Sequence, residues 1–199
     1  IGYYPSLFGV DVRISHADLQ PVDSLSKDLY GILGVSIYSE GKESIEEVIV
    51  QLGKEKNKTI STAESCTGGL IGHRLTEIPG SSDVYKGGLV VYSNESKIEM
   101  VGVGKGTLEG HGAVSAETAE SMAYNVKNKF VSDYGISVTG IAGPTGGTKE
   151  KPVGLVYIGL AKNDGVKVKE FRFGNNRKRN KLRSSQVALN WLRLSLLNG

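Results

Sequence analysis

The chain has 199 residues, of which 39% are hydrophobic and 23% charged, and it carries a net charge of +3. These values are typical of a globular protein with one good-sized domain and room for a small appendage. No apolar run approaches the ~18 residues of a membrane-spanning helix, so we expect no membrane anchor. A single cysteine excludes an internal disulfide and suits a reducing cytoplasm; with three histidines it makes a poor zinc ligand set.

Residues 1–40 differ in pattern from the rest of the chain. Ile1 is not followed by a basic-then-apolar leader, so we expect that the sequence begins inside a longer protein or lacks its true start. The elements predicted here are a strand, a helix ended by glycine and a second strand-like stretch, at 10–14, 23–33 and 32–38. The polar segment 39–42 predicts a boundary, and we interpret residues 1–40 as the tail of a preceding domain.

From residue 41 onward, helical and strand-like patterns alternate. The predicted helices lie at 45–52, at 70–78, from Asn94 to 101, from Ser115 for roughly 15 residues and at 178–197; the predicted strands lie at 59–61, 88–93, 136–139, 153–161 and 166–173. A hairpin signal, Asn163-Asp164-Gly165, separates the last two strands. We therefore predict an α/β fold over residues 41–199, a three-layer α/β/α sandwich with a mixed sheet.

The most informative segment is Thr62–Gly69, with the sequence TAESCTGG. Its neighbours predict a strand before it and a helix after it. Such a glycine-rich turn presents backbone N–H groups to an anion or oxyanion, and the helix dipole adds to the attraction. Ser65, Cys66 and Thr67 bring hydroxyl or thiol groups to the turn, as acyl transfer requires. An ordinary strand-to-helix connection with a Ser or Thr cap explains the segment equally well.

A second glycine-rich segment, Thr139–Gly147, follows a predicted strand. It therefore opens at a carboxyl end of the sheet, where α/β proteins usually bind ligands. Its spacing is not that of a dinucleotide fingerprint, and Pro144 opposes an immediate helix. Glycines permit close approach of the backbone to a ligand, although a plain flexible loop has the same composition.

Tyr92 and Lys97 lie where a predicted strand ends and the next helix begins. Both can project over the same end of the sheet as Ser65. A serine activated by lysine without histidine is a known variant of triad chemistry, but lysine acts as a base only if its pKa is lowered. An exposed lysine is the alternative. Cys66 has no visibly paired histidine, so we expect a small buried thiol there.

Several segments, in order over roughly 42–199, resemble the CinA family of competence/damage-inducible proteins, in particular its C-terminal, PncC-type nicotinamide mononucleotide (NMN) deamidase domain. The segments that carry the resemblance are Thr62–Gly69, Gly88–Asn94 with Lys97, His111–Ser115, Thr139–Gly147 and Lys151–Gly154. Residues 1–40 resemble the end of the middle domain, and its linker, that precedes this domain in full-length CinA proteins. We therefore expect two units, 1–40 and 41–199.

The resemblance implies hydrolysis of the NMN carboxamide to nicotinate mononucleotide and ammonia, through an acyl-enzyme and without metal or other cofactor. It implies that Ser65 is the nucleophile, that Lys97 is the general base and that Tyr92 assists proton transfer. The residues expected to contact the substrate are Cys66, Thr67, Gly68, Gly69, Thr139, Gly140, Ala142, Gly143 and Arg177. Relatives usually carry an arginine where this chain has Lys181, so the part of Lys181 in phosphate binding is left open.

A basic segment at 162–183 holds nine lysines and arginines against Asp164 and Glu170. Such a segment binds nucleic acid or a phosphorylated small molecule, or is only a solvated surface. The alternative function is therefore a non-catalytic, competence- or damage-associated protein that binds DNA or a recombination protein. A third reading is an amidohydrolase with another substrate. For the enzyme we expect NMN as substrate, a homo-oligomer, most simply a dimer, and a cytoplasmic location.

Overall fold

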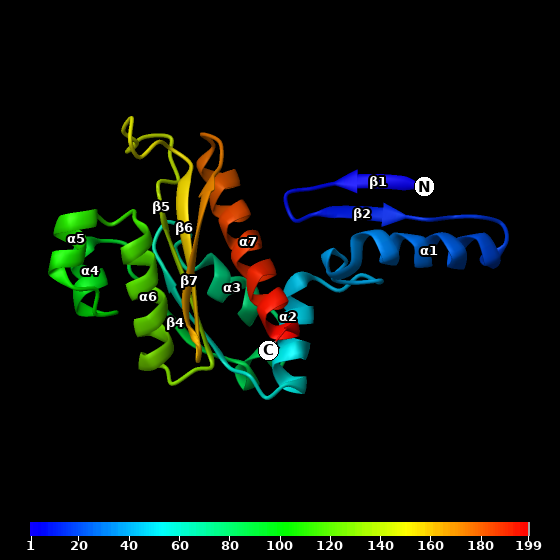
Figure 1. Ribbon diagram of the computed structural model, residues 1–199, viewed down its shortest axis with the longest axis horizontal. Coiled ribbons are helices and arrows are strands. Elements are labelled where there is room, and N and C mark those ends of the chain that lie inside the picture. Colours follow the sequence, from blue (N-terminus) through cyan, green and yellow to red (C-terminus); the bar gives the residue numbers. More distant parts are fainter. Residues whose placement is uncertain (199) are drawn as a thin grey trace.

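The computed structural model describes residues 1–198 and is built around one mixed five-stranded sheet with the order β4-β3-β5-β6-β7 (Figure 1). The strands are β3 (Ile60–Glu64), β4 (Tyr85–Val90), β5 (Tyr134–Gly140), β6 (Leu155–Lys162) and β7 (Gly165–Arg172). The first three run parallel, and β6 and β7 join antiparallel. Because β3 lies inside the sheet with helices on both faces, all of its residues are buried.

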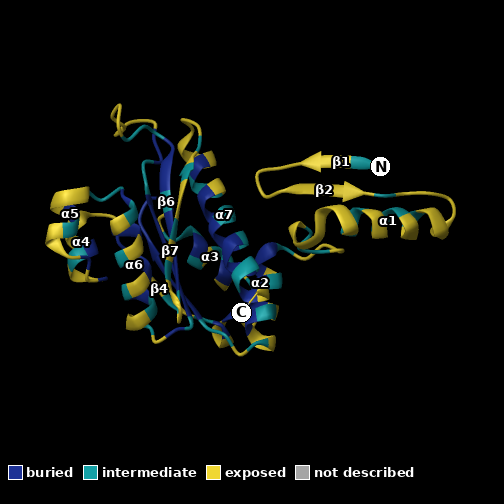
Figure 2. Ribbon diagram, in the orientation of Figure 1, coloured by how far each residue is buried: buried dark blue, intermediate teal, exposed yellow. Residues whose placement is uncertain are grey.

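Helices cover both faces of this sheet (Figure 1). On one face lie α2 (Ile45–Glu55), α3 (Leu70–Thr76) and α7 (Arg177–Leu197); on the other lie α4 (Asn94–Glu99), α5 (Lys105–His111) and α6 (Ala116–Lys129). Each face has its own apolar core, and Figure 2 shows the buried inner strands between them. The predicted three-layer α/β/α sandwich with a mixed sheet is therefore confirmed. None of the described helices has the length and apolar character that a bilayer crossing requires.

The first 36 residues form their own set of elements. These are the hairpin of β1 (Gly2–Pro5) and β2 (Val10–Arg13), the helix α1 (Leu19–Leu33) and the 3-10 turn η1 (Gly34–Ser36). No residue of these elements is buried, as expected for elements too few to build a core. The strand-like stretch predicted at 32–38 is wrong. Gly34, with φ of 49°, ends α1 by donating its N–H to the carbonyl of Tyr30, and η1 follows instead.

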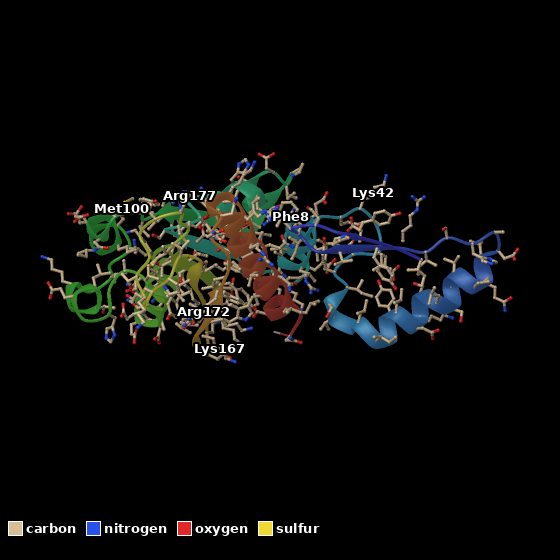
Figure 3. The ribbon with its side chains drawn as sticks, turned by 90° about the horizontal axis from the view of Figure 1, so that it is seen from above. Phe8, Lys42, Met100, Lys167, Arg172 and Arg177 are labelled. Atoms are coloured by element: carbon tan, nitrogen blue, oxygen red, sulfur yellow. The ribbon has the colours of Figure 1, made fainter. Side chains whose placement is uncertain are left out.

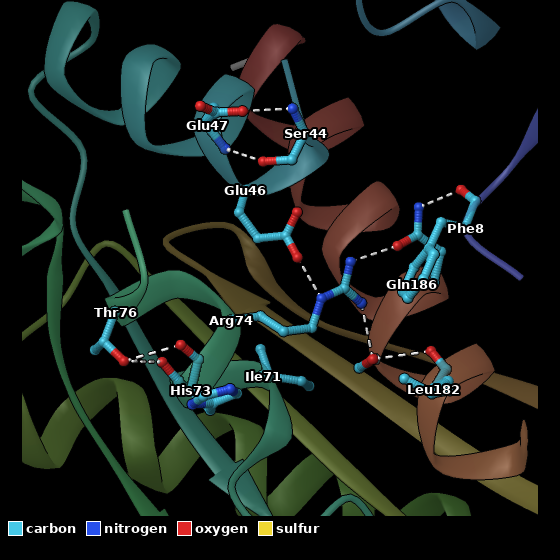
Figure 4. A network of polar contacts seen from close by, with 12 residues as sticks. Phe8, Ser44, Glu46, Glu47, Ile71, His73, Arg74, Thr76, Leu182 and Gln186 are labelled. Carbon is cyan, nitrogen blue, oxygen red and sulfur yellow. Dashed lines mark hydrogen bonds and ion pairs between the residues drawn. The ribbon is translucent and has the colours of Figure 1, made fainter. Parts of the chain in front are cut away.

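The hairpin meets the sheet domain at Arg74 on α3 (Figure 4). The Arg74 guanidinium pairs with Glu46 of α2 and donates hydrogen bonds to Ser185 (2.8 Å) and Gln186 (2.6 Å) of α7. It also lies 5.1 Å from the ring centroid of Phe8, whose carbonyl accepts a hydrogen bond from the Gln186 amide (2.6 Å). One nearly buried arginine thus holds α3 against two other helices and the hairpin.

Two predicted details near the end of β4 differ from the structure. The strand spans Tyr85–Val90 at the edge of the sheet and alternates in exposure, whereas a buried strand was predicted at 88–93. The residue that caps α4 is Ser93, whose hydroxyl accepts a backbone N–H three residues further on (3.1 Å), and not Asn94. The chain therefore leaves the sheet earlier than predicted, and Tyr92 lies beyond the strand.

Candidate active site

The carboxyl ends of β3, β4 and β5 meet at one edge of the sheet, and Ser65 follows the central strand there. Its backbone N–H donates to the carbonyl of Val138 on β5 (2.9 Å), and the carbonyl of Glu64 accepts the N–H of Val91, just after β4 (2.8 Å). The chain leaves β3 through α3 on one face and reaches β5 through α4 to α6 on the other. This is a topological switch point, where open α/β sheets bind ligands.

Two glycines with left-handed backbone, Gly68 (φ 63°) and Gly69 (φ 88°), turn the chain from β3 into α3. The Gly68 N–H closes this turn on the carbonyl of Ser65 (3.0 Å). Among the described residues, the backbone N–H groups of Cys66, Thr67 and Gly69 have no oxygen acceptor. These three amides are the donors that the turn offers to an oxyanion.

Two amides at the start of α3 are not free to bind an anion, contrary to the expectation drawn from the helix dipole. The buried carboxylate of Glu64 reaches across the turn and accepts the N–H groups of Ile71 (3.1 Å) and Gly72 (2.9 Å). A carboxylate of the protein itself therefore neutralises this helix terminus. An oxyanion formed at Ser65 depends on the amides of the turn instead.

Lys97 is only 1% exposed, and its terminal nitrogen lies beside Ser65. Nζ stands 3.1 Å from Ser65 Oγ. It also stands 2.9 Å from the carbonyl oxygen of Val91, 3.1 Å from that of Tyr92 and 3.4 Å from that of Ser93. A neutral amine fits this geometry, because its two N–H bonds can point to the two nearer carbonyls while its lone pair faces the serine hydroxyl.

Burial also favours the neutral form of this lysine. Desolvation lowers the pKa of Lys97, while the nearby Cys66 and Glu95 oppose the change by smaller amounts. The uncharged amine is the form that accepts a proton from Ser65. The buried position thus supplies the condition that a lysine base requires.

The two residues after Ser65 are closed off from solvent. Burial raises the pKa of the Cys66 thiol to about 12, and the charge of Glu64 adds a smaller contribution in the same direction. This thiol is protonated near neutral pH, so Cys66 does not compete as a nucleophile. Thr67 is fully buried, and its hydroxyl is the one buried side-chain polar atom in the described chain that lacks a hydrogen-bond partner.

A guanidinium connects the loops on either side of Ser65. Arg177, the first residue of α7, donates to the carbonyl of Gly143 after β5 (3.0 Å) and to the hydroxyl of Tyr92 after β4 (2.9 Å). Since β3 lies between β4 and β5, this bridge spans the edge where Ser65 lies only 7% exposed. In the described chain the Tyr92 hydroxyl has no hydrogen bond to Ser65 or Lys97, so its part in proton transfer stays a prediction.

The other predicted contact residues on this edge are largely engaged within the protein. Thr139 Oγ1 donates to the carbonyl of Ala113 (2.6 Å), and the Ala142 carbonyl accepts a hydrogen bond from Asn180 (2.9 Å). Gly140 is the last residue of β5. Of these groups, the Thr139 oxygen still has a free lone pair, and Asn180 emerges as a buried support of the loop.

Lys181, whose part in phosphate binding the sequence left open, lies beside the turn Ser65–Gly69. A Cβ atom built on Gly68 would stand 3.5 Å from Lys181 Nζ. Lys181 follows Arg177 by one helical turn, so both cations share one face of α7. The spacing of four residues was visible in the sequence, but the direction of this face depends on how α7 packs.

The cations of the basic segment 162–183 are divided between the hairpin of β6 and β7 and the helix α7. Figure 3 shows Arg177 well apart from Arg172 and Lys167. Arg172 also pairs with Glu170 at 2.8 Å, which satisfies part of its charge locally. The cations that matter for the site are those at the start of α7.

Within residues 1–198, no three His, Cys, Asp or Glu side chains lie together as metal ligands. His73 and His111 are exposed, and each lies beside a glutamate, Glu77 (3.8 Å) and Glu117 (3.3 Å). The groups at the edge of the sheet are instead an amine, a hydroxyl, backbone amides and two cations. These suit a phosphorylated substrate and a developing oxyanion.

The sequence model of the CinA C-terminal domain matches residues 42–196. A relative from Caldicellulosiruptor bescii, named as competence-damage inducible, is 45% identical over 98% of this chain and 49% of its own length. A CinA-like protein from Kosmotoga olearia is 47% identical over 87% of this chain and 42% of its own length. The chain thus spans about half the length of these relatives. The crystal structure of the competence/damage inducible protein CihA from Agrobacterium tumefaciens superimposes with a TM-score of 0.74 and 42% identity, covering 77% of this chain and 93% of that one.

Proposed function

Since the chain belongs to the CinA family, we propose that it is an amidohydrolase that converts NMN to nicotinate mononucleotide and ammonia. The observation that carries the proposal is the distance of 3.1 Å between Lys97 Nζ and Ser65 Oγ, with the lysine 1% exposed. A serine beside a desolvated lysine suits acyl transfer without histidine. The resemblance to NMN deamidases selects the substrate.

In the proposed reaction, Ser65 Oγ attacks the carboxamide carbon while its proton moves to Lys97 Nζ. The carbonyl oxygen becomes an oxyanion, which the amides of Cys66, Thr67 and Gly69 stabilise. Lys97 then gives the proton to the leaving nitrogen, the C–N bond breaks and ammonia departs, which leaves nicotinate mononucleotide esterified to Ser65. Water attacks this ester while its proton moves to Lys97 Nζ, and Lys97 returns that proton to Ser65 Oγ as the acyl bond breaks and nicotinate mononucleotide leaves.

Arg177 and Lys181 are the cations proposed to hold the phosphate of NMN. Arg177 now donates to two neutral oxygens, those of Gly143 and Tyr92. A phosphate dianion is a stronger acceptor for a guanidinium than either of them. Lys181, near Gly68, adds positive charge with less directionality, since an ammonium acts as a point charge.

The direct test is to incubate the purified chain with NMN and to measure ammonia and nicotinate mononucleotide. We expect Ser65→Ala to fold normally and to lose nearly all ammonia release, because no nucleophile remains and only the amides of the turn and substrate binding are left. Ser82→Ala, at an exposed serine outside the site, is the matched control and keeps the activity of the unmodified chain. Undiminished ammonia release by Ser65→Ala would exclude the serine mechanism.

The alternative proposal, a non-catalytic DNA-binding protein, makes a different prediction for the same preparation. It requires a salt-dependent complex with duplex DNA and no ammonia from NMN or related pyridine nucleotides. The separation of Arg177 from Arg172 and Lys167 does not favour it (Figure 3). Release of ammonia from another carboxamide, with none from NMN, would keep the Ser65 and Lys97 chemistry and change only the substrate.

A further inference from the structure

Glu64 makes no hydrogen bond to the side chain of Ser65 or of Lys97, but it is connected to both through the backbone. Its carboxylate accepts the N–H groups of Ile71 and Gly72 in the first turn of α3, and Ser65 is the next residue in the chain. Its carbonyl accepts the N–H of Val91 (2.8 Å), and the carbonyl of Val91 accepts a hydrogen bond from Lys97 Nζ (2.9 Å). Glu64 is therefore joined both to the turn Ser65–Gly69 and, through Val91, to a carbonyl that contacts Lys97 Nζ.

We propose that Glu64 is a positioning residue, whose carboxylate holds the turn Ser65–Gly69 in the one conformation that aims Ser65 Oγ at Lys97 Nζ. This inference rests on the proposed function, because it assumes that Ser65 and Lys97 react together. Glu64 itself does not touch the reacting atoms.

The turn needs such a restraint because of its glycines. Gly68 and Gly69 both have left-handed backbone, and glycine adopts other conformations at little cost. Apart from Glu64, the turn is held by the Ser65 N–H on Val138 (2.9 Å), by the Gly68 N–H on the Ser65 carbonyl (3.0 Å) and by the His73 N–H on the Gly69 carbonyl (2.8 Å). The carboxylate closes the remaining side by joining the end of β3 to the start of α3. Both of its oxygens are used, and Glu64 is only 1% exposed.

The same carboxylate decides which donors and which nucleophile the turn offers. It occupies the amides of Ile71 and Gly72, and within the turn itself the amides of Cys66, Thr67 and Gly69 stay free. Its negative charge also disfavours a second anion beside it, and this contribution adds to burial in keeping the Cys66 thiol protonated. The hydroxyl of Ser65, next to the lysine, is left as the reactive group.

The test uses Glu64→Gln, which keeps the shape of the side chain but places an NH2 group against one of two N–H donors. We expect kcat for NMN to fall about 100-fold, the size of loss that a displacement near 1 Å causes, with KM changed by less than about threefold. Glu64→Asp retains the charge on a side chain shorter by one methylene. We expect a similar loss of kcat from it, because position and not charge is what matters.

Glu47→Gln is the matched control. Glu47 also accepts a backbone N–H at a helix start, from Ser44 (2.6 Å), but it lies on α2. We expect its kcat to equal that of the unmodified chain. Rates are compared per folded molecule, with the folded fraction taken from urea unfolding. A kcat for Glu64→Gln that falls only with its folded fraction, or an equal loss in Glu47→Gln, would overturn the proposal.

A second readout separates this inference from the proposed function. A fluorophosphonate probe labels an activated serine without any NMN, and mass spectrometry identifies the labelled residue. We expect fast labelling of Ser65 in the unmodified chain and about 100-fold slower labelling in Glu64→Gln. If NMN is not hydrolysed but this difference holds, only the substrate proposal fails. Equal labelling rates would overturn the role of Glu64. If both Glu64 variants fail to fold, the proposal is also overturned, because the carboxylate is then needed for folding.

Discussion

Replacing Lys97 with methionine removes the only described side chain that hydrogen-bonds to Ser65 Oγ (3.1 Å). Because no second group stands ready to take the serine proton, we expect the whole contribution of general-base catalysis to be lost. That contribution is about 10²- to 10⁴-fold in kcat, or about 3–5 kcal/mol of barrier. The amides of the turn remain, so activity stays above the uncatalysed rate.

The substitution also changes the surroundings of the side chain. The carbonyls of Val91 and Tyr92 lose their donor, at about 1–3 kcal/mol for each buried acceptor, which the removal of a desolvated amine partly offsets. The assay is therefore ammonia release from NMN at a temperature where circular dichroism shows Lys97→Met to be folded. Lys86→Met, the same change at an exposed position on β4, serves as control.

The pH profile tests the protonation state directly. Burial lowers the pKa of Lys97 from its ordinary value of 10.5, and the neutral amine is the form that the proposed mechanism requires. We expect kcat of the unmodified chain to rise with pH and to level off below pH 10.5, whereas Lys97→Met shows no such rise. A kcat for Lys97→Met within about tenfold of the unmodified value would refute the assignment of Lys97 as the base.

Three further substitutions test other parts of the site and fold. Arg177→Lys cannot reproduce the two-pronged contact of the guanidinium, so we expect KM for NMN to rise about 10- to 100-fold while turnover of nicotinamide riboside stays constant; an unchanged KM contradicts this. Thr67→Val removes an unpartnered buried hydroxyl, so we expect the free energy of unfolding, measured in urea titrations, to rise by about 1–3 kcal/mol. We also expect kcat/KM to fall. A less stable variant would mean that the hydroxyl has a partner. Arg74→Met leaves Glu46 buried without its cation, so we expect the free energy of unfolding to fall by about 3–5 kcal/mol while kcat per folded molecule is retained. A loss below about 1 kcal/mol would show that the ion pair is solvated.

Features governed by neighbours in the sequence could be predicted. Ser115 caps α6 as expected, since its hydroxyl accepts the N–H of Thr118 (3.1 Å). The Asn163-Asp164-Gly165 signal gives the hairpin of β6 and β7, where Lys162 pairs with Gly165. The mixed sheet follows from the order of such local elements. The strand predicted at 32–38 failed because a glycine cap at Gly34 outweighed the apolar pattern.

Features that depend on the direction of a side chain were not predictable. Lys97 and Ser65 were expected at the same end of the sheet, but only the packing of α4 shows that they are 3.1 Å apart. The hydroxyl of Tyr92 points to Arg177, because the chain has already left the sheet beyond the end of β4. Glu64 was missed as a cap, because it precedes the helix by six residues and acts from outside the usual capping position.

Burial of the single cysteine has a consequence for how the protein responds to oxidants. Burial raises the pKa of the Cys66 thiol to about 12, so the thiol stays protonated near neutral pH. Peroxides and electrophiles attack the thiolate and not the thiol, and 5% exposure limits their access further. A sulfur atom therefore lies directly beside Ser65 without making this position sensitive to redox conditions. We expect the hydrolysis proposed at Ser65 to continue under oxidative stress that inactivates enzymes with an exposed catalytic cysteine.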